Sequence, residues 1–241
     1  MSEKILTYQT RLSLCETEGA LLEEYASLMA AVERALFAQY AKGNSTASCK
    51  NAFLRLYHIT ARQFNACRVS LEGKIAACQA GQDNAITSLK LQSETLGRKI
   101  SLLEKKASKG AVVHQKKRRL AILQARLALL EKDKAKKKVR LCFGGKRLFR
   151  AQFHLEKSGF KTHLEWKQAW DAKRANEFFL LGSKDETSGN QSCVLSLQSN
   201  GKLSLRLRLP KALEDRYGKY LIIKDLHFPY GQETLLSALN N

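Results

Sequence analysis

Leucine and isoleucine recur every three to four residues along two neighbouring stretches, and this spacing constrains the fold more than any other feature. The first stretch carries a heptad with one gap at Ser93, formed by Ile86, Leu89, Leu96, Ile100 and Leu103. The second follows Lys109-Gly110 and consists of Leu120, Leu123, Leu127 and Leu130. Because heptad spacing buries one stripe of each helix, the pattern predicts an antiparallel helical hairpin over about residues 86–138.

The outer faces of this predicted hairpin are almost entirely basic. Residues 98–140 contain 16 Lys or Arg and 3 Asp or Glu, within a chain of 241 residues whose net charge is +20. Solvated coiled-coil faces usually mix both signs, so these helices should repel each other unless a polyanion lies beside them. We expect nucleic acid along the hairpin, in contact with Lys116, Lys117, Arg118 and Arg119. A charged surface that only keeps the protein in solution is the alternative.

Helical periodicity also covers the region before the hairpin. Apolar spacing predicts a helix from Thr17 to Tyr40 that ends at Lys42-Gly43-Asn44. A second helical block is expected over residues 46–78, with a break near His58 and an end at Gln79-Ala80-Gly81.

The second part of that block begins with a capping box, Thr60 followed three residues later by Gln63. Side chains at the start of a helix often bind nucleic acid. The residues expected to do so here are Arg62, Gln63, Asn65 and Arg68. The alternative is that Gln63 only completes the cap and Arg62 is solvated.

From Val139 onward the periodicity is mostly two, with short helices between strands. Strands are expected at 139–143, 147–153, 177–182, 191–198, 202–209 and 219–228. The first dozen residues also alternate and should be extended. Strands that flank a long helical region predict an α+β fold.

One β-hairpin can be registered from sequence. A two-residue loop at Asn200-Gly201 would mix apolar with polar residues on both faces. A three-residue loop, Ser199-Asn200-Gly201 with the glycine left-handed, instead pairs Leu203 with Leu197 and keeps the leucines together. The opposite face then displays Lys202, Arg206 and Arg208.

Basic side chains are expected on the strand pair 139–153 as well. A sheet surface with fixed Arg spacing beside a basic hairpin suits a phosphate backbone. The expected contacts are Lys146, Arg147 and Arg150, with Lys184 from the loop 182–190, which is equally well explained as a solvated connection.

A helix capped by Thr162 and Glu165 carries Trp166 and Trp170 on one face. Tryptophans at this spacing usually dock on a core. Stacking on a base is the alternative.

The sequence gives little support for a metal site, a membrane segment or a catalytic site. The six cysteines never form a C-x₂₋₄-C pair, which argues against a zinc ribbon and for reduced thiols in a cytoplasmic protein. No run approaches the roughly 18 apolar residues of a membrane span, and the N-terminus does not resemble a signal peptide. The five histidines are scattered. We therefore expect no catalytic residue, no metal ligand and no membrane partner.

Four segments in order give the chain a family resemblance. They are YHITARQFNACRVSLEGKI (57–75), CFGGKRLFRAQFHLEKSGFKTHLEWKQAW (142–170), FFLLGSKDETSGNQSC (178–193) and LSLRLRLPKALEDRYGKYLIIKDLHFPYG (203–231). Together they resemble the N-terminal half of the transposon-encoded TnpB (OrfB) proteins of prokaryotes, which are RNA-guided nucleases.

The resemblance implies a division of the chain. A small, mostly antiparallel β-barrel, the wedge, would be formed by residues 1–14 and 139–231. An inserted helical recognition lobe with the long basic hairpin would occupy 15–138. A tail, 232–241, would lead to a nuclease domain outside this chain. The implied partners are a guide RNA and its heteroduplex with target DNA, and the protein would read backbone shape more than base sequence.

The catalytic half of that family is not recognisable here. A RuvC-like centre needs carboxylates from separate strands to hold two Mg²⁺ ions, and the scattered candidates include Asp185, Glu186 and Asp225. We expect Mg²⁺ and Zn²⁺ only in the missing half, no cofactor in this chain and no DNA cleavage by it alone.

Two other functions remain open from the sequence. One is a complete, nuclease-less DNA- or RNA-binding regulator or accessory protein. The other is a structural coiled-coil protein that oligomerises through the hairpin. The oligomeric state is left open.

Overall fold

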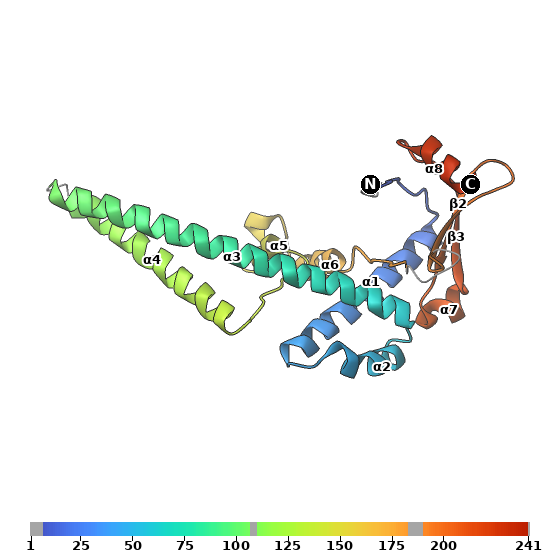
Figure 1. The fold of residues 1–241 in the computed structure, drawn as a ribbon, viewed down its shortest axis with the longest axis horizontal. Helices are drawn as coiled ribbons and strands as arrows, with labels where there is room; N and C mark the ends of the chain where they lie inside the picture. Colours follow the sequence, from blue (N-terminus) through green and yellow to red (C-terminus); the bar gives the residue numbers. More distant parts are fainter. Residues whose placement is uncertain (1–6, 107–109, 183–189, 241) are drawn as a thin grey trace, which may run out of the picture. The chain divides into compact units, whose positions relative to one another are not determined.

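The computed structural model describes residues 7–106, 110–182 and 190–240, and within it the chain divides into two units (Figure 1). Unit 1 comprises residues 1–70 and 143–241, and unit 2 comprises residues 71–142. The boundary at Ser70 falls inside one long helix. The α+β class expected from the sequence is confirmed.

The elements follow one another in this order: α1 (Glu16–Ala41), α2 (Thr46–Leu56), α3 (Ala61–Lys105), α4 (Gly110–Ala135), α5 (Lys146–Ala151), a 3₁₀ turn η1 (Glu156–Ser158), α6 (His163–Arg174), β1 (Cys193–Leu197), β2 (Leu203–Arg208), α7 (Lys211–Tyr217), β3 (Tyr220–Leu226) and α8 (Gln232–Asn240).

The predicted first helix is confirmed as α1. Its start is fixed by the Glu18 carboxylate, which accepts a hydrogen bond from the Cys15 N–H at 2.9 Å. It ends before Gly43, whose φ of 84° is the left-handed conformation that glycine adopts without strain. Its buried stripe supplies much of the core of unit 1 and consists of Leu21, Tyr25, Met29, Val32 and Leu36.

The break near His58 and the capping box at Thr60 are confirmed. The Thr60 hydroxyl accepts from the Gln63 N–H at 3.2 Å, and the Gln63 side chain accepts from the Thr60 N–H at 2.9 Å. The predicted end at Gln79-Ala80-Gly81 is wrong, because α3 continues to Lys105. A helical glycine costs only about 1 kcal/mol relative to alanine, and packing of the following heptad against α4 offsets this.

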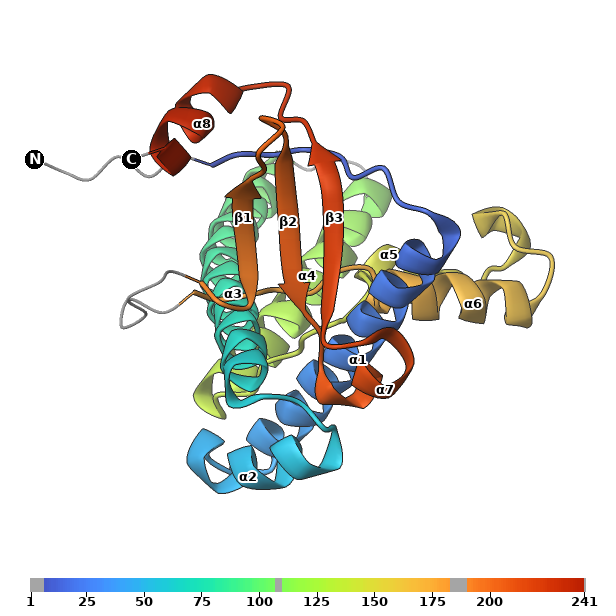
Figure 2. The same cartoon turned by 90° about the vertical axis from the view of Figure 1, so that its right-hand side faces the viewer.

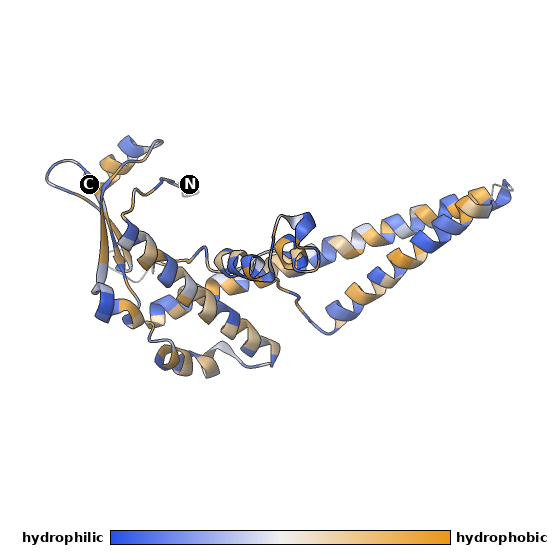
Figure 3. Cartoon of the chain, turned by 180° about the vertical axis from the view of Figure 1, so that it is seen from behind, coloured by the Kyte–Doolittle hydropathy of each residue, from blue (hydrophilic) through white to orange (hydrophobic). Residues whose placement is uncertain are grey.

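In unit 2, α3 and α4 form the expected hairpin, and orange hydrophobic residues alternate with blue polar ones along both helices (Figure 3). Ile86, Leu89 and Ile100 are buried, and the four heptad leucines of α4 are half-buried. The Gln82 amide also donates to the Leu130 carbonyl at 3.0 Å across the pair. Lys109 of the expected turn lies outside the described residues.

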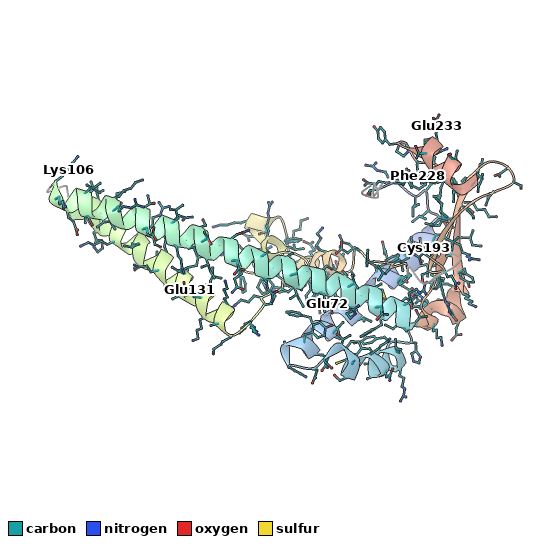
Figure 4. All side chains as sticks on the ribbon, in the orientation of Figure 1. Glu72, Lys106, Glu131, Cys193, Phe228 and Glu233 are labelled. Carbon is teal, nitrogen blue, oxygen red and sulfur yellow. The ribbon has the colours of Figure 1, made fainter. Side chains whose placement is uncertain are left out.

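Ion pairs join the two helices. They are Asp83–Lys134 at 2.8 Å, Lys90–Glu131 at 2.9 Å and Glu104–Lys117 at 2.8 Å, with Glu131 labelled on α4 in Figure 4. Each is exposed and contributes less than about 1 kcal/mol. The expected repulsion between the helices is therefore only partly correct, because oppositely charged residues face each other across the hairpin.

After α4, the Arg140 guanidinium forms two hydrogen bonds with the Asp133 carboxylate, at 2.5 and 3.1 Å. These bonds hold the pKa of Asp133 below its ordinary value. All three acids of residues 98–140 are thus paired, and most of the cations there have no carboxylate from this segment to neutralise them.

The three strands form an antiparallel sheet in unit 1, in the order β1-β2-β3 (Figure 2). Leu203 pairs with Leu197 and Leu205 with Leu195, and Gly201 has a φ of 78°. The predicted three-residue loop and register are therefore confirmed. A bulge shifts the β2–β3 register between Leu203 and Leu205, where Asp225 adopts a φ of 57°.

The strands predicted at 139–143 and 147–153 are wrong. Residues 139–142 are irregular, and 146–151 form α5. Gly144 and Gly145 both have positive φ, so they make a turn that feeds a helix. The Trp166 indole N–H donates to the Leu148 carbonyl at 2.7 Å, which leaves that carbonyl satisfied without a strand partner.

No strand is formed by the described part of 177–182, so this prediction is also wrong. Residues 7–15 are extended but have no strand assignment, and residues 1–6 lie outside the description. The Thr10 hydroxyl donates to the His227 carbonyl, and the Tyr8 ring meets Phe228 edge-on, just beyond β3 (Figure 4). The sheet formed by the described residues is open and three-stranded, and a closed barrel is not shown.

Helices α5 and α6 pack through aromatic rings, since Phe149 of α5 lies 5.7 Å from Trp170 of α6. Trp166 and Trp170 stack with centroids 5.9 Å apart, and Trp166 is buried. The predicted docking of this pair on a core is therefore confirmed for Trp166. The Thr162 cap is confirmed as well, since its hydroxyl accepts from the Glu165 N–H at 3.2 Å.

Replacement of Gly144 should destabilise this packing. A Cβ at Gly144 would lie 2.8 Å from the Arg174 Cγ and 3.0 Å from the Trp170 ring, on a backbone with a φ of 85°. We expect Gly144→Ala to lower the free energy of unfolding by about 1–3 kcal/mol in urea titrations. Gly145→Ala is the matched control, because it also has positive φ but no neighbour within 4 Å. Equal losses in the two variants would contradict the packing argument.

Ser93, the gap in the heptad, should be replaceable with a gain in stability. Its hydroxyl oxygen is buried and has no hydrogen-bond partner among the described residues. We expect Ser93→Ala to raise the free energy of unfolding by about 1 kcal/mol, measured by thermal denaturation followed by circular dichroism. Ser101→Ala, on the exposed side of the same helix, controls for the helix propensity of alanine. A gain no larger than that of the control would count against this account.

Candidate nucleic-acid interface

The N-terminus of α3 is held in place by buried hydrogen bonds. The Gln63 amide donates to the Tyr25 hydroxyl at 3.1 Å, while the same side chain caps the helix at Thr60. Tyr25 is fully buried, its ring stacks on Phe178 at 4.2 Å, and burial raises its pKa to about 12. The first turn of α3 therefore has a fixed position in unit 1.

The turn before α3 is joined to the end of the sheet. His58 has a φ of 47°, and its carbonyl accepts a hydrogen bond from the Ala212 N–H at 3.0 Å. Leu209 is fully buried, and its N–H donates to the Lys219 carbonyl at 3.0 Å. The end of β2, the start of α7 and the α2–α3 turn are thereby brought together.

A pocket of about 950 Å³ lies at this junction. Its wall combines side chains from α2, the α2–α3 turn, α3, the end of β2 and α7. The lining residues are Leu54, Arg55, His58, Ile59, Thr60, Ala61, Arg62, Asn65, Leu181, Gly182, Arg208 and Lys211. We call it the basic pocket, because four of these residues are cationic and none is Asp or Glu.

The electrostatics of the basic pocket favour an anion. Four like charges on one wall repel one another, and the N-terminus of α3 adds the positive end of a helix dipole. The Arg208 Nε is buried and has no hydrogen-bond partner among the described residues. A phosphate group in the pocket would offset the repulsion among these cations, as a charge-assisted hydrogen-bond acceptor.

Arg208 also belongs to the face of the sheet that points away from the leucines. This outer sheet face consists of Val194, Ser196, Ser204, Arg206, Arg208, Tyr220 and Ile222, as the pairing register requires. Arg206 is exposed and lies over the Tyr220 ring at 4.9 Å, and the Lys219 ammonium lies 5.5 Å from the same ring. Cation–π contacts of this kind hold the guanidinium in a defined position.

Three residues predicted on separate grounds meet here. Arg62 and Asn65 were expected at a helix start and Arg208 on a sheet face, and all three line the basic pocket. Gln63 does not join them, because it is 2% exposed and serves the cap and Tyr25. Arg68 is half-buried further along α3 and is not part of the pocket lining.

The other predicted contacts lie elsewhere. Lys146, Arg147 and Arg150 are exposed on α5, a helix, and not on a strand as expected. In unit 2, Lys117 is paired with Glu104, Lys116 is half-buried, and the two following arginines, Arg118 and Arg119, are exposed. Lys184 lies outside the described residues.

Sequence reasoning missed Arg55, Lys211, Lys219 and Tyr220. Tyr220 could have been found, because it alternates with the buried Leu221 and Ile223 and therefore shares the outer sheet face. Arg55 and Lys211 carry no such signal. They lie on α2 and α7, and the hydrogen bond between the Ala212 N–H and the His58 carbonyl joins α7 to the turn that follows α2.

The described residues contain few features that indicate another kind of site. No group of His, Cys, Asp and Glu there is arranged to hold a metal ion. All six cysteines are free thiols, of which Cys49 and Cys67 are buried and Cys15 is exposed. None of the helices in the described ranges combines the length and apolarity needed to cross a membrane.

Arg208→Met should stabilise the unliganded protein. It removes a half-buried cation whose Nε lacks a partner and keeps an apolar stem, so we expect the free energy of unfolding to rise by about 1 kcal/mol. Urea denaturation at low salt without polyanion measures this. Arg206→Met is the control on the same strand and should instead lose about 0.5–1 kcal/mol of cation–π energy. A loss of stability in Arg208→Met would show that this guanidinium supports the fold.

Comparison of the chain with protein-family models, with curated proteins and with solved structures found no match.

Proposed function

We propose that this chain binds nucleic acid through the basic pocket and the outer sheet face. The observation that carries the proposal is the position of Arg208, which lines the pocket and also follows Arg206 along β2. Cations therefore continue from a concave site onto a flat face. A small anion would contact only the basic pocket, whereas a chain of phosphates would contact both the basic pocket and the outer sheet face.

The basic hairpin of unit 2 supports a polyanionic ligand independently. Three of its acids, Glu104, Glu131 and Asp133, are already in ion pairs, and the exposed Arg118 and Arg119 have no carboxylate nearby in sequence to pair with. Neutralising such a surface with phosphates releases counterions, which is the main source of sequence-independent affinity for nucleic acid.

More specifically, we propose a guide-RNA and RNA–DNA heteroduplex-binding part of a TnpB-like, transposase-associated protein. The support is the sequence resemblance, together with cations that suit a phosphate backbone. Residues 7–15 lie beside the end of β3, as the first strand of a wedge barrel would.

Self-association through unit 2 is a second candidate function. Large apolar side chains are exposed on the hairpin, where a monomer usually carries polar residues. They are Leu91, Leu102, Ile122 and Leu129, between 49% and 62% exposed. Light scattering that shows a salt-insensitive oligomer without bound nucleic acid would favour this function.

Loss of the sheet arginines should change the salt dependence of binding. We expect Arg206→Ala and Arg208→Ala each to weaken binding to RNA by a similar factor for unrelated sequences, and each to lower the slope of log K against log salt by about one unit. Fluorescence anisotropy over a salt series measures this. Lys42→Ala, an exposed cation at the end of α1, is the control and should leave the slope unchanged. Unaltered affinity and slope in both arginine variants would remove the outer sheet face from the interface.

The nature of the ligand requires a separate experiment. The full chain is purified in high salt, and the RNA that remains bound is sequenced. One enriched, structured RNA would support the guide-binding proposal. Bulk RNA that washes away with salt would reduce the function to general polyanion binding.

A further inference from the structure

We propose that Phe149 and Phe153 form a stacking platform for unpaired bases, an inference that rests on the proposed nucleic-acid function. The two rings are 45% and 67% exposed, although burial of a phenylalanine side chain is normally favourable. Their centroids are 6.3 Å apart at an interplanar angle of 82°. The pair therefore presents rings in two orientations to the surroundings.

The platform is anchored to the interior by a row of aromatic rings. Trp166 is 7% exposed and stacks on Trp170, which lies 5.7 Å from Phe149, which in turn contacts Phe153. Exposure increases along this row towards Phe153. The Arg174 guanidinium lies 5.3 Å from the Trp170 ring. A row fixed in this way holds Phe149 in place before a ligand arrives, which lowers the entropy cost of binding.

The charges around the platform select the class of ligand. Lys146, Arg147 and Arg150 are exposed on α5, and the sequence from 146 to 155 contains no Asp or Glu. On a helix, positions 146, 147 and 150 lie within about 100° of one another, next to the stripe of Phe149. Aromatic faces bordered by cations match bases bordered by phosphates.

The occupant is single-stranded and not double-stranded nucleic acid. In a duplex the faces of the bases are covered by their neighbours, so an exposed phenylalanine finds no π-face to stack on. In a single strand each base offers a face, and stacking is tolerant of sequence. The three cations of α5 then contact the adjoining phosphates. They are Lys146, Arg147 and Arg150, which were expected on a strand from the sequence.

The test uses the full chain and three RNA probes of equal length. They are an oligoadenylate of about 12 nucleotides, an abasic strand with the same backbone, and the duplex of the first with its complement. We expect Phe153→Ala to weaken binding to the oligoadenylate by about tenfold and to leave binding to the abasic strand and the duplex within about twofold. The double variant Phe149→Ala/Phe153→Ala should lose more in the same pattern.

Two control variants separate stacking from simple apolar contact. Phe153→Leu keeps an apolar side chain without a ring, so it should lose affinity for the oligoadenylate as Phe153→Ala does. Leu164→Ala removes another side chain of this region, 65% exposed on α6, and should change nothing. Quenching of Trp170 fluorescence on binding of the oligoadenylate, but not of the abasic strand, is a further expected result.

The outcomes distinguish this inference from the function on which it rests. If the wild-type protein binds none of the three probes, the proposed function itself fails. If it binds them and Phe153→Ala loses all three equally, or Phe153→Leu retains full affinity, the proposed function stands and the stacking platform is wrong.

Discussion

The side chain of Gln63 makes the contacts on which the rest of unit 1 depends. It accepts a hydrogen bond from the Thr60 N–H and donates one to the Tyr25 hydroxyl, so a helix cap and a core contact share one amide. Tyr25 is fully buried and Thr60 is half-buried, and a buried polar group left unsatisfied would cost about 1–3 kcal/mol. The first turn of α3 is consequently fixed against α1, and the basic pocket opens from that turn.

Local signals predicted local structure well. The Thr60 and Thr162 caps, the Ser199–Gly201 loop and the leucine face of β2 all depend on residues close in sequence, and each was recovered. The errors came where a distant contact decided the outcome. Residues 147–153 alternate enough to suggest a strand, but Leu148, Ala151 and Leu155 also have helical spacing, and Trp166 selects the helix by bonding to the Leu148 carbonyl.

The sequence predicted individual residues of the candidate site but not that they lie together. The positions of Arg62 and Arg208 followed from a helix start and a strand alternation, two features that the sequence displays separately. Their meeting in one pocket depends on Ala212 bonding to the His58 carbonyl, a contact between residues far apart in the chain. For the same reason Arg55 and Lys211 could not be foreseen. Phe153 was missed because an exposed aromatic residue cannot be told from a buried one by spacing alone.

The uneven charge of unit 2 has a kinetic consequence. With Glu104, Glu131 and Asp133 paired, residues 98–140 carry an excess of positive charge whose field extends about 8–10 Å into physiological salt. Under the proposed function, a polyanion would first be captured in a loose encounter that tolerates many orientations. Association of such a ligand would be fast and strongly dependent on ionic strength, while its residence time would be determined by the few positions where guanidinium groups are held by aromatic rings.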